Sequence, residues 1–220
     1  MRRIVTSLLP LLIPLLIAAP LMAQTTLGFR GGLSDATVST DVEGVPDQDA
    51  RRGVVAGLDL SFPVGGTVEL RIGGAYVQKG TELSVDLPSE GIRGSGSIEA
   101  DWVQASALVR IGTPRDSGAS FGLLLGPWAA SLLSCNRSLS VDAGELGSVN
   151  ESASCDDVTK STDFGVAAGA GVEMAISDGL RLGVDLIYSL GLANIDDTST
   201  EDTKTRHVAL QAGFVIPFGG

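Results

Sequence analysis

Apolar and polar residues alternate over long segments of this chain, and that period of two is its most constraining feature. The clearest segment runs from Leu180 to Ala193. Its first face would carry Leu180, Leu182, Val184, Leu186, Tyr188, Leu190 and Leu192. Its second face would carry Arg181, Asp185 and mostly small residues. Successive side chains of a strand point to opposite faces, so we predict a strand with lipid on its apolar face and a crowded polar interior on the other.

Seven further segments show the same alternation. We predict strands at 25–35, 51–62, 67–79, 98–111, 120–132, 162–176, 180–193 and 206–218. The connections after the second, fourth and sixth strands are short and rich in turn residues, whereas the others are long and acidic. This layout is typical of outer-membrane barrels, with short periplasmic turns and long extracellular loops. We therefore expect an all-β fold, an eight-stranded antiparallel up-and-down transmembrane β-barrel, over residues 24–220.

The N-terminus resembles a cleavable export signal. Two arginines precede an apolar run from Ile4 to Ala19, and Ala23 offers a small residue at a cleavage site. We interpret residues 1–23 as a secretory signal peptide. A membrane-anchoring helix is the alternative, but the run is short for a span and contains two prolines. Export through a cleaved signal, followed by a barrel, predicts a location in the bacterial outer membrane.

Charge and hydropathy narrow the possible functions. The chain has 26 acidic and 15 basic residues, a net charge of −11. Nucleic-acid binding needs basic patches, so we expect no nucleic-acid partner. After residue 23 no window holds the roughly 18 apolar residues of a helical span, so membrane insertion would have to use strands. A soluble barrel of lipocalin type, with its apolar residues inside, is the rival architecture.

The polar faces of the predicted strands carry four bases and four acids. This predicted lumen charge network consists of Arg30, Asp59, Glu69, Arg71, Arg110, Glu173, Arg181 and Asp185. The interior of an eight-stranded barrel is just wide enough for side chains to fill it. Buried charges are costly unless they are paired, so we expect an interlocked plug, and a leak when Arg71 is replaced by alanine. The alternative is a narrow polar conduit or a ligand pocket that uses the same charges.

Four segments carry a resemblance to a known family: Gly74–Gly80, Leu124–Trp128, Asp163–Glu173 and Tyr188–Ile195. Together they resemble the outer-membrane β-barrel proteins of the PorT-like, OmpA/OmpX-like porin superfamily, which is common in Bacteroidetes-type bacteria. The resemblance covers the whole mature chain. It implies the barrel fold but no particular activity, because one fold serves many functions.

Family members commonly end in an aromatic residue that looks like the insertion signal read by the barrel-assembly machinery. The resemblance therefore implies this role for Phe214 and Phe218, and it implies the assembly machinery as a partner during biogenesis. The chain departs from the pattern in one respect, because Gly219 and Gly220 follow Phe218.

The two cysteines, Cys135 and Cys155, lie in one predicted loop, 20 positions apart (155 minus 135). In an exported chain such a pair most simply forms one disulfide. The rival interpretation is a redox or metal pair, but there is no CxxC spacing and the only histidine, His207, lies near the last strand. A serine hydrolase would have to centre on His207, and no serine lies within two positions of it. We expect no enzyme activity and no cofactor.

The predicted loops are rich in carboxylates, as at Asp41–Asp49 and Asp196–Asp202. The first interpretation is that they are solvated surface loops. The second is that they bind divalent cations, directly or as bridges to lipopolysaccharide, although no calcium-loop spacing is present. For the whole chain we expect a structural or surface-interaction role among outer-membrane lipid and lipopolysaccharide. A narrow porin-like channel and a lipid-modifying enzyme are the alternatives.

Overall fold

Strands make up nearly all of the described chain in this computed structural model. It describes residues 25–40, 49–87, 92–115, 118–142, 144, 147–156, 159–194 and 203–218. The strands are β1 (Thr25–Thr40), β2 (Asp49–Gly65), β3 (Val68–Leu87), β4 (Ile92–Gly112), β5 (Ala119–Asp142), β6 (Ser148–Ser154), β7 (Thr162–Ser177), β8 (Leu180–Gly191) and β9 (Thr203–Phe218). The predicted signal peptide, residues 1–23, lies outside the described residues.

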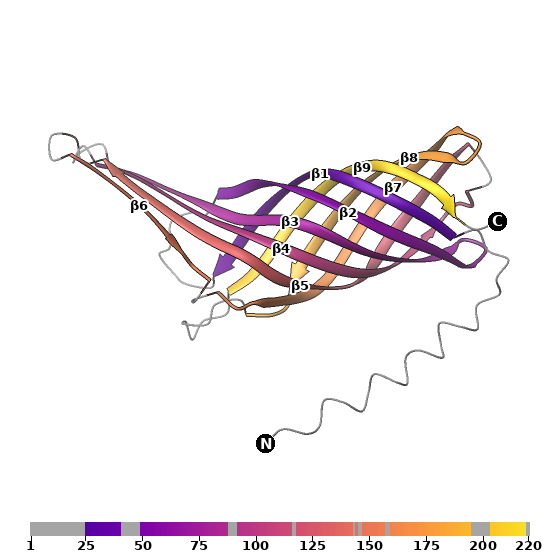
Figure 1. The fold of residues 1–220 in the computed structure, drawn as a ribbon, viewed down its shortest axis with the longest axis horizontal. Coiled ribbons are helices and arrows are strands. Elements are labelled where there is room, and N and C mark those ends of the chain that lie inside the picture. The colour runs from indigo at the N-terminus through magenta and orange to yellow at the C-terminus, as the bar shows by residue number, and fades with distance from the viewer. Residues whose placement is uncertain are drawn as a thin grey trace, which may run out of the picture.

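Eight of these strands close on themselves as an antiparallel barrel (Figure 1). The neighbours follow the order β4, β3, β2, β1, β9, β8, β7, β5, and the pairing of β4 with β5 closes the ring. The ninth strand, β6, pairs with β5 beyond the barrel. Closure matters because the interior of a membrane has no water to hydrogen-bond the backbone N–H and C=O groups of an unpaired strand edge. The structure therefore confirms the eight-stranded antiparallel barrel that the alternation predicts.

One end of the barrel carries the short turns and the ends of the described chain. Thr25 pairs with Phe218 there, so the first and last strands meet at this end. Two of its turns place a glycine at positive φ, 44° at Gly66 and 91° at Gly179, a backbone region in which glycine is favoured. We call this the turn end, and the opposite end the blade end.

Side chains alternate between an outward apolar set and an inward set, as the alternation of the sequence predicts. The outward apolar side chains are exposed in the isolated chain and include Phe29, Leu58, Ile72, Val103, Phe121, Leu125, Phe164, Leu186, Leu210 and Phe214. On β5, which is apolar on both faces, Leu123 points outward and Leu124 is buried inside. A belt of exposed apolar residues around a closed barrel is the surface expected against lipid.

The strands on one side of the barrel are longer than predicted. The 80–97 connection is in fact the end of β3 and the start of β4, whose ladder continues to Leu87 and Ile92. Likewise β5 continues to Asp142, and β6 forms inside the predicted loop. These segments alternate Ser, Thr and acids with apolar residues, so they retain the strand period although they are polar enough to be mistaken for loops.

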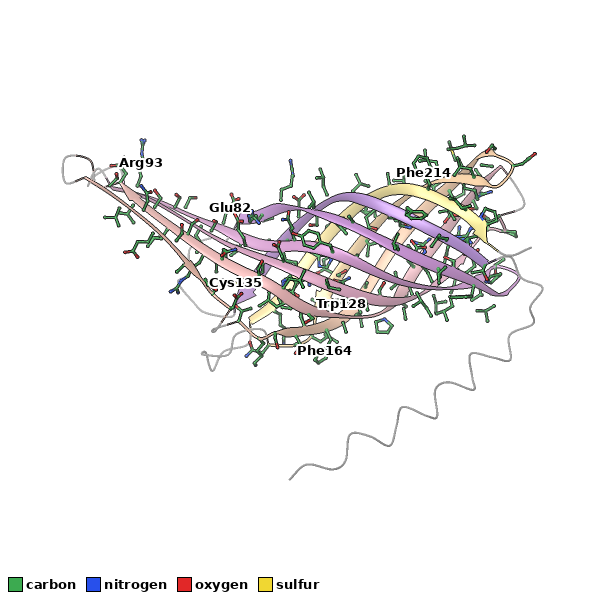
Figure 2. The ribbon with its side chains drawn as sticks, viewed as in Figure 1. Glu82, Arg93, Trp128, Cys135, Phe164 and Phe214 are labelled. Atoms are coloured by element: carbon green, nitrogen blue, oxygen red, sulfur yellow. A yellow bond between two sulfur atoms is a disulfide. The ribbon has the colours of Figure 1, made fainter. Side chains whose placement is uncertain are left out.

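The extensions form a four-stranded sheet that projects beyond the rest of the barrel at the left of Figure 1. We call it the blade, and it comprises residues 82–87, 92–99, 136–142 and 148–154. Figure 2 shows Arg93 near its tip and Cys135 near its base. Among the described residues, no helix is long and apolar enough to cross a membrane.

Candidate functional site

Inside the barrel, near the turn end, arginines and carboxylates form a connected network. Arg30 and Arg71 both reach Oδ2 of Asp185, with nitrogen–oxygen distances of 2.7 Å in each case. Arg30 also donates from Nε to Asp59 at 2.7 Å. These four side chains come from four different strands, β1, β3, β8 and β2, so their ion pairs bridge the lumen rather than run along one strand. All of them are buried.

Glu173, on β7, is the acid on which the network converges. Arg115 donates to both of its carboxylate oxygens, from Nε at 2.6 Å and from Nη2 at 2.9 Å. Three further arginines approach the same carboxylate within 3.4–3.7 Å: Arg30, Arg71 and Arg181. A bidentate arginine–carboxylate pair is among the stronger polar contacts in proteins. Sequence reasoning missed Arg115, because it belongs to the turn between β4 and β5, where no strand alternation indicates an inward side chain.

The remaining predicted charges complete the same network. Arg110 lies 3.3 Å from Glu69, and Arg115 lies 2.8 Å from the other oxygen of Glu69. Arg181 donates to the backbone carbonyl of Arg115 at 2.9 Å. The structure thus brings all eight predicted residues together and adds Arg115. We call these nine residues the arginine layer: Arg30, Asp59, Glu69, Arg71, Arg110, Arg115, Glu173, Arg181 and Asp185.

Glycines on the inward register make room for this layer. A Cβ atom added at Gly28 would lie 2.6 Å from the carboxylate of Asp59. One added at Gly122 would lie 2.5 Å from Nε of Arg110. Real Cβ atoms do not approach other atoms so closely, so larger residues here would displace the ion pairs. The small residues of the polar face are therefore part of the site.

A second buried layer crosses the lumen nearer the blade end. The ammonium of Lys79 lies 3.3 Å from Asp163 and sits over two indole rings, 4.2 Å from the centroid of Trp128 and 5.3 Å from that of Trp102. Asp163 also accepts a hydrogen bond from Thr205 at 2.7 Å. Cation–π contacts of this kind strengthen when the cation is removed from water. We call Lys79, Trp102, Trp128, Asp163, Thr205 and His207 the tryptophan layer.

The disulfide lies directly against the tryptophan layer. Cys135 and Cys155 are bonded, and both are buried in one apolar cluster with Trp102 and Trp128. The bond joins β5 to the residue that follows β6, at the base of the blade (Figure 2). The cysteine pair predicted from the sequence is thus present as a disulfide. Among the described residues there is no group of three or more His, Cys, Asp or Glu side chains arranged to hold a metal ion.

The two faces of the blade differ in polarity. On one face serines form cross-strand contacts: Ser97 with Ser138 at 2.8 Å, and Ser140, which donates to Asn150 at 2.6 Å. The other face has exposed apolar side chains, among them Ile98, Leu139 and Val149. Every residue of β6 is exposed, and within the described residues β6 pairs only with β5. The blade therefore presents an open strand edge to solvent.

The remaining predicted sites lie apart from the lumen. Phe214 points outward from β9 with 49% of its surface exposed, and Phe218 is the last residue of that strand. Their role as an insertion signal stays a prediction. The acidic segments Asp41–Gln48 and Asp196–Asp202 lie outside the described residues, so cation binding there also stays a prediction.

Comparison with known proteins assigns the chain to a protein family. The sequence profile of the outer membrane protein beta-barrel domain matches residues 22–197. The chain belongs to this family. Its fold and family together place it among bacterial outer-membrane barrels, in agreement with the resemblance found in the sequence.

Several solved structures of outer-membrane proteins are similar to this chain at low identity. OprG of Pseudomonas aeruginosa is 13% identical, with a TM-score of 0.50 over 90% of this chain and 97% of OprG. Neisserial surface protein A is 16% identical, with a TM-score of 0.45 over 88% of this chain and 97% of that one. Ail, the attachment invasion locus protein of Yersinia pestis, is 18% identical, with a TM-score of 0.43 over 88% and 99%. No curated protein sequence matches this chain.

Proposed function

We propose that this protein is a non-enzymatic outer-membrane barrel with a closed lumen that acts at the cell surface through its blade. The observation that carries the proposal is the pair of buried layers stacked along the lumen. Each layer joins side chains from different walls of the barrel, so each spans the interior. A solute would have to break both layers to cross.

Opening either layer costs free energy because it separates buried charges, and this supports a closed lumen. Removing one member of a buried ion pair leaves its partner charged in a poorly solvated space, which costs about 3–5 kcal/mol. Glu173 alone is within 3.7 Å of four arginines. The tryptophan layer adds a steric block, because Trp102 and Trp128 are 1% and 3% exposed.

The blade supports a role at the cell surface. Among the residues that the structure describes, one edge of its last strand, β6, is unpaired, and an unpaired edge can accept an extended segment of another protein as an additional strand. The serine-rich face beside this edge is suited to water, because its exposed hydroxyl and amide groups can hydrogen-bond to water as well as to one another. In this proposal outer-membrane lipid and lipopolysaccharide surround the apolar belt, and the blade stands outside them.

Planar-bilayer conductance tests the closed lumen. We expect no steady current from the wild-type protein. From the sequence alone, Arg71→Ala is expected to leak, but the tryptophan layer changes this expectation: Arg71→Ala alone should stay closed. Arg71→Ala combined with Trp128→Ala should conduct. Arg52→Ala, which removes a mostly exposed arginine paired with Asp35, is the matched control.

A narrow channel is the second candidate, and one observation favours it. A vestibule of about 570 Å³ opens at the turn end, and its lining includes Glu69, Arg115 and Arg181. If Arg115 moved away with its turn, this vestibule would extend into the arginine layer. A steady current from the wild-type barrel would decide for the channel and against the closed lumen.

A further inference from the structure

Glu151 lies at the centre of β6, the strand whose outer edge is unpaired in the described part of the chain. β6 runs from Ser148 to Ser154, so three of its residues precede Glu151 (151 minus 148) and three follow it (154 minus 151). Glu151 is exposed, and its register partner on β5 is Leu139. Any strand that adds to the outer edge of β6 therefore places one of its own residues beside this carboxylate.

The face of the blade that carries Glu151 is otherwise largely apolar near this edge. Side chains two positions apart on a strand share a face, so Glu151 lies between Val149 and Ala153. Val149 is 59% exposed, and Leu139 on the neighbouring strand is 52% exposed. Glu151 is the only charged residue of β6. The charge of an incoming strand is therefore sensed at one position, and its apolar side chains at the positions beside it.

The carboxylate of Glu151 makes no ion pair within the residues that the structure describes. Arg137, the base on the same face of β5, lies opposite Ala153 rather than opposite Glu151. A base that approaches from the outer edge would be the direct neighbour of Glu151. The net charge of −11 on the chain also favours the approach of a basic segment over an acidic one.

We propose that the outer edge of β6 binds an extended segment of another protein in which a lysine or arginine lies between two apolar residues, and that Glu151 selects this basic residue. The selection rests on the surface role proposed for the blade. Alternate residues of an added strand share a face, so the base would lie opposite Glu151 and the apolar residues opposite Val149 and Ala153. Opposite charges on neighbouring strands attract each other, and like charges directly opposite repel.

A second copy of this chain fits the same edge less well. If two β6 strands paired antiparallel over their full length, Ser148 of one copy would face Ser154 of the other. Glu151 would then face Glu151 of the second copy, which is the like-charge arrangement that destabilises a sheet. The charge at the centre of the strand therefore favours a different protein as the partner.

Two nine-residue peptides test the selection. Both have valine at the odd positions and threonine at the even positions, except at the central residue, which is lysine in one and glutamate in the other. Fluorescence anisotropy measures the binding of each labelled peptide to the folded barrel in phosphatidylcholine nanodiscs, which carry no net lipid charge and leave the blade accessible. We expect the lysine peptide to bind about tenfold more tightly than the glutamate peptide, because one cross-strand pair attracts and the other repels.

The variant Glu151→Lys should reverse this preference. The matched control is Glu99→Lys, which changes the net charge equally but lies on β4, two strands from the outer edge. It should keep the preference for lysine, since charges farther apart than about 8 Å are largely screened at physiological salt. Equal binding of the two peptides, or a preference for lysine that survives Glu151→Lys, would overturn the selection by Glu151 alone. If neither peptide bound, strand addition at the blade would be overturned with it.

Amide hydrogen exchange separates strand addition from simple attraction between charges. We expect the lysine peptide to slow exchange across 148–154, because an added strand hydrogen-bonds to the outer edge, and to leave exchange in β8 unchanged. A lysine peptide with N-methylated amides should lose both its binding and this protection. Binding without slower exchange at 148–154 would overturn the proposal. A dimer of the wild-type barrel that formed through β6 would assign the edge to a second copy, and would overturn it as well.

Discussion

At the scale of the residue, Glu173 shows how one buried carboxylate can hold a network together. It is 1% exposed, and its two oxygens face arginines from β1, from β3, from β8 and from the turn that precedes β5. Because these arginines come from different parts of the wall, the carboxylate cross-links the barrel as well as neutralising charge. Its removal leaves several guanidinium groups underpaired at once.

We expect Glu173→Gln to lower the free energy of unfolding by about 3–5 kcal/mol, because it breaks buried ion pairs without removing volume. The matched control is Glu99→Gln. Glu99 pairs with Arg51 at 2.7 Å, but its side chain is 51% exposed, so its loss should cost at most about 1 kcal/mol. Denaturant unfolding in vesicles measures both variants. Equal costs for the two would show that the network does not stabilise the barrel.

Residues of the lumen are predictable where strand alternation reaches them. The eight charges of the predicted network all lie within predicted strands, three of them close to a strand end, so the period of two assigns them to the inner face. Lys79 and Asp163 lie near the ends of predicted strands but share the register of Arg71 and Glu173, so the same period of two could have added them to the inner face. Arg115 lies in a turn and has no periodicity at all. The partners across the lumen depend on barrel closure, which local sequence does not encode.

At the scale of the element, β6 depends on a single neighbour. It runs from Ser148 to Ser154, has no buried residue, and pairs with β5 alone in the part of the chain that the structure describes. Little apolar burial stabilises such a strand, so its position depends on its ladder and on the disulfide that follows it. The chain-entropy model gives a loop of this length about 3 kcal/mol of stabilisation.

We expect the double variant Cys135→Ser with Cys155→Ser to release β6 while the barrel persists. Amide hydrogen exchange should become faster across 148–154 and in the facing segment of β5, 136–142. Exchange in β8, far from the bond, should not change and serves as the internal control. Faster exchange in β8 would mean that the disulfide supports the whole barrel instead of one strand.

The eight barrel strands are predictable in number and position but not in extent, and the ninth strand, β6, is not predicted. The alternation locates all eight barrel strands, because their outward faces are apolar along most of their length. The blade strands keep the period but exchange apolar residues for serine, as at Ser138 and Ser140. Glycine at 94 and 96 further weakens the apparent strand propensity. Pairing with long neighbours keeps these segments in the sheet, and that pairing is a tertiary effect.

At the scale of the whole molecule, the apolar belt determines which solvent surrounds the barrel. Leu186 and Leu210 are paired across β8 and β9, and they are 52% and 57% exposed in the isolated chain. In water such a belt would be a large unfavourable surface. In a bilayer it is the surface that inserts.

We expect Leu210→Arg to destabilise the membrane-inserted barrel by about 2–4 kcal/mol, the cost of a charge on the lipid face. Leu139→Arg is the matched control, because Leu139 is as exposed as Leu186 but lies on the blade. It should leave insertion unchanged. The stability of each variant is measured by denaturant unfolding in vesicles, with the folded fraction detected by heat-modifiable migration on gels. A barrel that tolerated both changes equally would not have lipid at residue 210.

The tryptophan layer also gives the protein an optical property. The chain contains two tryptophans, and both surround Lys79 at one depth of the lumen. The tryptophan emission of the molecule, excited at wavelengths that tyrosine does not absorb, therefore originates from a single slice a few ångströms thick. A refolding trace recorded by that emission therefore reports the assembly of the tryptophan layer. A shift in the emission wavelength reports entry of water at that depth, without an added dye.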